Sequence, residues 1–97
     1  LDQSRVAGLG NLLVDETLWH AGLDPTRPAD TLSAAEQRAL ARSATRTVRR
    51  LTRRGGSHLG DLQDARIRGG TCPRCGSPLA RATVGGRTTY WCPAEQR

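Results

Sequence analysis

The cysteines near the C-terminus are the residues whose types and spacing are best suited to chemistry. Cys72-Pro-Arg-Cys75 separates two thiols by two residues, and Cys92 follows after a segment typical of a β-hairpin. Two thiolates at this spacing can bind one metal ion while backbone N–H groups of the turn point at the sulfurs. The final turn reads Cys92-Pro-Ala-Glu95, so a glutamate stands where a fourth cysteine would complete a tetrahedral zinc site.

Three interpretations of these cysteines stay open. In the first, Cys72, Cys75 and Cys92 bind Zn²⁺, and the fourth ligand is Glu95, His58 or a water molecule. In the second, no metal is bound and packing alone holds the hairpin. In the third, two cysteines form a disulfide, which the odd cysteine count and the lack of a visible secretory signal disfavour. We expect zinc, in a structural rather than a catalytic role.

The composition suggests a polyanionic partner. The 97 residues contain 15 arginines, no lysine and nine acidic residues, which gives a net charge of +6. Without lysine the chain can form no lysine Schiff base. No apolar run approaches the roughly 18–20 residues that span a bilayer, so we expect no membrane partner. The chain opens with Leu1 rather than methionine, and we expect a monomeric fragment of a longer protein.

Two helices are expected to support these residues. Gly8-Leu9-Gly10 predicts a turn, and Asn11 is placed to cap a helix that ends at Gly22. Ser33 and Glu36 form a capping box, which predicts a second helix over about 34–54.

The second helix is expected to be amphipathic. Its apolar side is predicted to consist of Leu40, Ala44, Val48 and Leu51, with arginines on the opposite side. These arginines favour electrostatic steering of an anionic partner more than direct contacts. Beyond them, residues 72–97 predict a small β module with its hairpin turn at Gly85-Gly86.

Two stretches together resemble the formamidopyrimidine/endonuclease VIII family of DNA glycosylases. The stretch VAGLGNLLVDETLWHAGLDPTRPADTLS (6–33) resembles the helix–two-turn–helix of that family, and CPRCGSPLARATVGGRTTYWC (72–92) resembles its C-terminal β-hairpin zinc finger. The implied fold is mainly α with a small β-hairpin zinc finger. It divides into a helix–two-turn–helix DNA-binding domain at 1–56, a linker at 57–71 and a finger at 72–97 that lacks the fourth cysteine.

The resemblance implies a DNA-binding part of a base-excision-repair glycosylase and AP lyase that acts on damaged double-stranded DNA. Gly10, Asn11 and Arg87 would then contact DNA phosphates, and the metal ligands would be Cys72, Cys75, Cys92 and Glu95. The catalytic N-terminal domain of the family, which begins with proline and glutamate, has no counterpart here. We therefore expect this chain alone to be inactive, and the parent protein to act in the bacterial cytoplasm at the nucleoid.

Two other functions are weighed beside this one. The chain is interpreted alternatively as a stand-alone, catalytically inactive paralogue that binds DNA or a repair protein. A zinc-ribbon module for protein–protein contacts would require the glycine-asparagine motif to be a coincidence.

Overall fold

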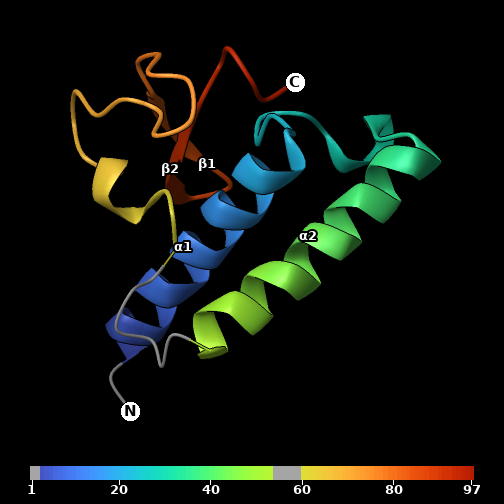
Figure 1. Cartoon of the computed structure of the whole chain (residues 1–97), viewed down its shortest axis with the longest axis horizontal. Helices are drawn as coiled ribbons and strands as arrows, with labels where there is room; N and C mark the ends of the chain where they lie inside the picture. The colour runs from blue at the N-terminus through green and yellow to red at the C-terminus, as the bar shows by residue number, and fades with distance from the viewer. Residues whose placement is uncertain (1–2, 54–59) are drawn as a thin grey trace.

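Two long helices and one antiparallel hairpin make up the computed structural model, which describes residues 3–53 and 60–97 (Figure 1). Side chains are described from residue 12 onward. The elements in chain order are α1 (Gln3–Ala21), the 3₁₀ turn η1 (Ala29–Thr31), α2 (Ala34–Arg53), the 3₁₀ turn η2 (Gln63–Ala65), β1 (Ala80–Val84) and β2 (Arg87–Trp91). The predicted fold class, mainly α with a small β-hairpin module, is confirmed.

The first helix begins earlier than the sequence predicted. α1 is continuous from Gln3 to Ala21, so Gly8-Leu9-Gly10 is not a turn and Asn11 is not an N-cap. Glycine permits a turn without requiring one, and its cost inside a helix is roughly 1 kcal/mol relative to alanine. Continuing an existing hydrogen-bond ladder offsets that cost, because nucleation rather than propagation is the unfavourable step.

The second helix has the predicted start. The backbone N–H of Glu36 donates to Oγ of Ser33, and the Ser33 N–H donates to Oε1 of Glu36. This is the reciprocal capping box expected from the sequence. Arg27 adds an ion pair to Glu36 at 2.6 Å. Together with the backbone bond from Ser33, this arginine lowers the pKa of Glu36 to about 2.

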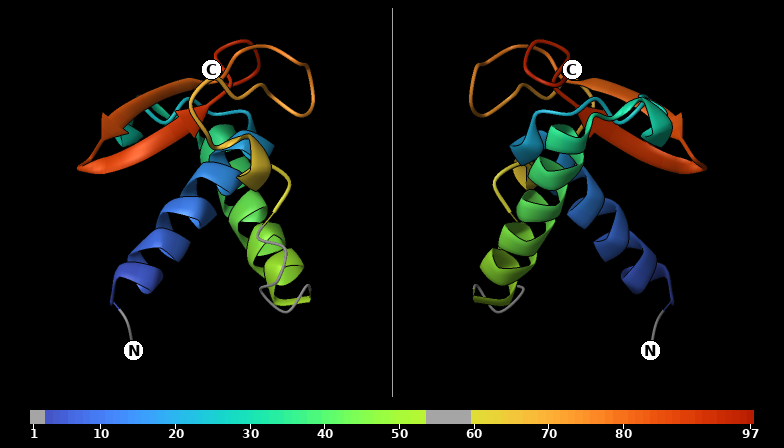
Figure 2. Two further views of the ribbon diagram at one scale, coloured as in Figure 1. Left: turned by 90° about the vertical axis from the view of Figure 1, so that its left-hand side faces the viewer. Right: turned by 90° about the vertical axis from the view of Figure 1, so that its right-hand side faces the viewer.

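The buried positions of α2 match the predicted apolar side only in part, at Leu51. Leu40, Ala44 and Val48 line a groove between α2 and α1. Ser43, Thr47 and Leu51 are buried, whereas Val48 is 52% exposed. Ser43 donates a hydrogen bond to the carbonyl of Thr17. Because the side chains of Ser43 and Thr47 are small, the two helices can approach closely here. α1 and α2 meet at one end and diverge toward the other (Figure 2). None of the described helices has the length and hydrophobicity needed to cross a membrane.

The hairpin forms where it was predicted. β1 pairs with β2 in the register Ala80↔Trp91 to Val84↔Arg87. Gly85 and Gly86 have φ values of +58° and +79°, the left-handed conformations that a two-residue turn of this twist requires. The hairpin lies across the joined end of the helix pair and projects to one side (Figure 2).

The core includes residues from both the helices and the hairpin module. Trp19 of α1 packs with Leu62, Cys72 and Cys92, and all four are at most 4% exposed. The buried positions Leu12 and Leu23 share the helical spacing of Trp19. Because the hairpin module has so few apolar residues, its packing depends on α1.

Candidate functional site

Three sulfurs and one carboxylate converge at the base of the hairpin. The donor atoms of Cys72, Cys75, Cys92 and Glu95 all lie within 4.8 Å of one another. Sγ of Cys75 is 3.5 Å from Sγ of Cys92, and Sγ of Cys72 is 3.3 Å from Oε1 of Glu95. All three cysteines are free thiols. The tertiary structure therefore brings together the four residues that the sequence predicted as metal ligands.

These distances fit a tetrahedral zinc ion. With Zn–S bonds of about 2.3 Å, two ligand sulfurs lie about 3.8 Å apart, close to the separation of Cys75 and Cys92. The carboxylate is oriented by Arg74, whose Nε donates to Oε2 of Glu95 at 2.7 Å and leaves Oε1 toward the sulfurs. His58, the other protein candidate for fourth ligand, lies outside the described residues.

The surroundings of the thiols favour a metal-bound thiolate at Cys72. Burial opposes ionisation of Cys72, but hydrogen bonds from the backbone of Cys75 and Arg74 and from the Trp19 indole outweigh it and lower its pKa. Burial and the neighbouring Cys75 thiol raise the pKa of Cys92 to about 11. A bound cation would reverse that second shift, because metal coordination stabilises the thiolate.

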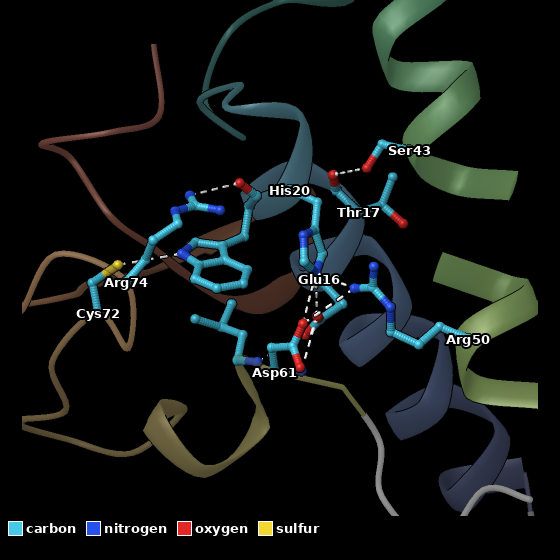
Figure 3. Close-up of polar contacts among 10 residues, drawn as sticks. Glu16, Thr17, His20, Ser43, Arg50, Asp61, Cys72 and Arg74 are labelled. Atoms are coloured by element: carbon cyan, nitrogen blue, oxygen red, sulfur yellow. Dashed lines mark hydrogen bonds and ion pairs between the residues drawn. The ribbon is translucent and has the colours of Figure 1, made fainter. Parts of the chain in front are cut away.

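Trp19 and Arg74 connect this site to α1. The indole Nε1 of Trp19 donates to Sγ of Cys72 at 3.4 Å (Figure 3). Arg74 stacks 3.9 Å from the centre of the Trp19 ring and donates to the Trp19 carbonyl at 3.0 Å. Arg74 thus contacts both Glu95 and the helix. The sequence analysis assigned no role to Arg74, although its position inside Cys-x₂-Cys was a usable signal.

Gln96 is a second anchor that the sequence analysis missed. Its side chain is buried, accepts a bond from the Cys92 N–H at 2.7 Å and donates to the Leu23 carbonyl at 2.9 Å. The turn that carries Glu95 is therefore fixed to the chain just after α1. No pattern around Gln96 predicted this contact.

Asp15 joins α1 to the hairpin. Its Oδ2 accepts bonds from the Tyr90 N–H at 3.1 Å and from Nε of Arg66 at 3.0 Å. Its Oδ1 is buried and has no hydrogen-bond partner within the described residues. Burial raises the pKa of Asp15, although Tyr90, Arg66 and the charge of Arg87 all oppose this. Asp15 therefore holds β2 against α1.

Arg87 lies beside the hairpin turn, as the sequence placed it. In the part of the chain that the structure describes, its guanidinium has no hydrogen bond and no ion pair. Gly10 and Asn11 lie inside α1, where backbone N–H groups are used by the helix. The side chain of Asn11 is outside the described part, so the DNA contacts of all three residues stay predictions.

Glu16 binds the backbone of the segment that follows α2. It is 1% exposed, and its two oxygens accept bonds from the Asp61 and Leu62 N–H groups at 2.9 Å each (Figure 3). His20 lies 2.7 Å from Oε2. A Cβ on Gly60 would come within 2.5 Å of Oε1, so this close approach requires glycine.

Comparison with known proteins decides the family. The model of the formamidopyrimidine-DNA glycosylase H2TH domain matches residues 1–62, and that of the zinc finger found in FPG and IleRS matches 69–94. The chain belongs to the formamidopyrimidine-DNA glycosylase family. Its second match is a zinc finger, and the four clustered donors fit that ion, which supports zinc as the cofactor.

Individual relatives agree with this assignment. The chain is 40% identical to the formamidopyrimidine-DNA glycosylase of Laribacter hongkongensis and 38% identical to that of Roseiflexus. Both alignments include the whole chain but only 41% of the relative, and they extend over 111 positions, so the relatives carry extra residues within the aligned region.

Solved structures of the family have the same fold. Lactococcus lactis Fpg (MutM) bound to FAPY-dG DNA superimposes with a TM-score of 0.77 at 30% identity, over 91% of this chain and 36% of that one. MutM in complex with carbocyclic 8-oxo-G DNA gives a TM-score of 0.77 at 32% identity, over 91% of this chain and 35% of that one.

The raised pKa of Asp15 leads to a prediction about pH. In the folded chain this acid holds its proton more tightly than in the unfolded chain, so its contribution to stability is greatest below the unfolded pKa of about 3.8 and falls as pH rises through the folded pKa. We therefore expect the melting temperature of Asp15→Asn to rise relative to that of the unmodified chain as pH increases from 3.8. Thermal unfolding monitored by circular dichroism at matched pH values measures this difference. A constant or shrinking difference would contradict the assigned effect of burial.

Proposed function

We propose that this chain is the DNA-gripping C-terminal part of a base-excision-repair DNA glycosylase. The observation that carries the proposal is the direct attachment of the hairpin to α1, through Asp15, Tyr90 and the core around Trp19. Two modules fixed in this way can hold one duplex at two places. Arg87 contacts one phosphate from the hairpin turn, and Asn11 contacts another from α1.

The charges and the relatives support a phosphate-based grip. Arginine can bind a phosphate through two parallel hydrogen bonds, and Arg87 has no competing ion pair among the described residues. The net charge of +6 attracts a duplex at long range. The solved relatives are complexes with DNA that contains FAPY-dG, 8-oxo-G or an abasic site. Phosphate contacts position a protein on DNA without reading its sequence.

We also propose that Cys72, Cys75, Cys92 and Glu95 hold the zinc ion. When bound, Zn²⁺ cross-links the turns at the two ends of the hairpin module and neutralises the thiolates. Arg74 orients Glu95, and the Trp19 indole supports the Cys72 sulfur. In this arrangement the ion fixes the hairpin, and therefore Arg87, relative to α1.

We propose that the chemistry of the whole protein belongs to a part of the relatives that this chain does not cover. The chain spans about two fifths of the curated relatives it matches. We propose that the parent protein flips a damaged base out of the duplex, cleaves its glycosidic bond and nicks the strand. We place this activity at the nucleoid of a bacterial cell.

The grip is tested by DNA binding of the isolated, zinc-loaded chain. We expect weak binding to a short duplex, with log K falling against log salt at a slope of about −0.9 per phosphate contact. Arg87→Ala is expected to weaken binding by roughly 1–3 kcal/mol, the scale of a lost charge-assisted contact, and Asn11→Ala by a similar amount. Fluorescence anisotropy at several salt concentrations measures both effects.

Arg38→Ala is the matched control for Arg87→Ala. It removes one exposed positive charge from α2 without altering the hairpin. If both variants lose affinity equally, the duplex responds only to overall charge and the assigned grip is wrong. Binding that does not depend on salt would have the same consequence.

A further inference from the structure

A cavity between α1 and α2 has the lining of an anion site. Its volume is about 220 Å³. It is lined by His20, Ala21, Ala39, Arg42, Ser43, Arg46, Thr47 and Arg50. None of these residues is acidic and three of them are arginines. The cavity shares α1 with the proposed DNA grip, but its lining includes none of the residues of that grip.

The three arginines lie along one side of α2. A spacing of four residues turns a helix by only about 40°, so Arg42, Arg46 and Arg50 point in similar directions. Like charges at this spacing repel one another. Arg50 is paired with Asp61 at 3.1 Å, but Arg42 and Arg46 have no ion pair with any described residue. Both side chains are exposed, so their guanidinium groups are accessible to an anionic ligand.

The floor of the cavity contains a buried hydroxyl group without a partner. Thr47 is 2% exposed, and its Oγ1 makes no hydrogen bond within the described residues. The neighbouring Ser43 differs, because its hydroxyl donates to the Thr17 carbonyl at 2.7 Å. A buried hydroxyl without a hydrogen-bond partner is unfavourable, so a ligand that accepted its hydrogen bond would be stabilised.

We propose that this cavity binds a phosphate group. Arg42 and Arg46 would supply paired donors from the rim, and Thr47 would donate from the floor. A tetrahedral dianion matches this set, because it carries several acceptor oxygens and the site offers donors and positive charge.

This site is separate from the proposed DNA grip. Asp15, which holds the hairpin, and His20, which lines the cavity, are about 140° apart around α1 at 100° per residue. The hairpin and the cavity therefore lie on different sides of α1, and the DNA contact at Arg87 does not include the cavity. The phosphate belongs either to a free small anion or to a different stretch of DNA backbone.

The test is a titration of the zinc-loaded chain with inorganic phosphate at low ionic strength, followed by the ¹H–¹⁵N NMR signals of Ala39, Ser43 and Thr47. We expect saturable shifts at these residues. Arg42→Gln/Arg46→Gln is expected to weaken binding at least tenfold, and Thr47→Val, which keeps the side-chain shape, by roughly tenfold. The control Arg49→Gln/Arg53→Gln removes the same charge from α2 outside the cavity and is expected to change binding less than twofold.

A second arm titrates a 12-base-pair duplex instead of phosphate. Shifts around the cavity with phosphate support a free anion as the ligand, and shifts there with the duplex alone support a backbone phosphate. If neither probe shifts these signals, or if the two double variants lose equal affinity, the proposal is wrong. In the Arg42→Gln/Arg46→Gln background, Arg87→Ala should still weaken DNA binding. Failure of this site is therefore distinguishable from failure of the DNA grip.

Discussion

Removal of zinc is expected to unfold the hairpin module while the two helices stay largely formed. The buried residues of this module include Cys72 and Cys92, which we propose as metal ligands, so little apolar packing is left without the ion. Structural zinc in small fingers is worth roughly 10–16 kcal/mol of apparent binding energy, and a carboxylate in place of a thiolate leaves this site at the weaker end. We expect the chelated chain to lose the hairpin at room temperature.

Trp19 provides the measurement. Its indole touches the Cys72 sulfur and lies under Arg74, so loss of the module should expose the ring. The tryptophan fluorescence, to which Trp91 of β2 also contributes, should then shift to longer wavelength. Metal analysis of protein purified without added zinc should give about one ion per chain. A metal content near zero in a chain whose hairpin is folded would support the metal-free interpretation instead.

Variants of Glu95 define the fourth ligand. Glu95→Cys is expected to increase resistance to chelator, because it restores a fourth thiolate. Glu95→Ala is expected to lower zinc affinity modestly. Arg74→Gln serves as a control, since it removes the ion pair to Glu95 but keeps the carboxylate. If Glu95→Ala and Arg74→Gln have the same effect on zinc affinity, Glu95 acts through its ion pair and is not a ligand.

Glu16→Ala is expected to destabilise the chain by about 2–5 kcal/mol. The substitution leaves the buried Leu62 N–H and the part-buried Asp61 N–H without their acceptors, and an unsatisfied buried donor costs roughly 1–3 kcal/mol. Leu62 is fully buried against Trp19, so loosening its backbone also weakens the core. Chemical denaturation measures the loss, and amide hydrogen exchange at Leu62 should become faster.

Glu16→Gln is the matched control. It keeps one carbonyl oxygen as an acceptor but turns an NH₂ group toward the other donor, so we expect an intermediate loss. An Ala variant that is as stable as the unmodified chain, with unchanged exchange at Leu62, would show that water replaces the carboxylate at no cost.

The sequence by itself determined the features that depend on local chemistry. The capping box of Ser33 and Glu36, the turn at Gly85-Gly86 and the metal-ligand spacing from Cys72 to Glu95 each depend on residues close in the chain or on one hairpin. The family resemblance also came from such local motifs.

The tertiary structure determined where α1 begins, which side of α2 is buried and which distant residues contact α1. α1 begins at Gln3 rather than after Gly10, because a helix already propagating outweighs the preference of glycine for turns. The buried positions of α2 are Ser43, Thr47 and Leu51, so two small polar residues are buried beside one residue of the predicted apolar side. The backbone N–H groups that donate hydrogen bonds to Asp15 and Glu16 belong to residues 45 to 75 positions away. Such hydrogen-bond partners depend on how distant segments pack together, and residue spacing in the sequence does not predict that packing.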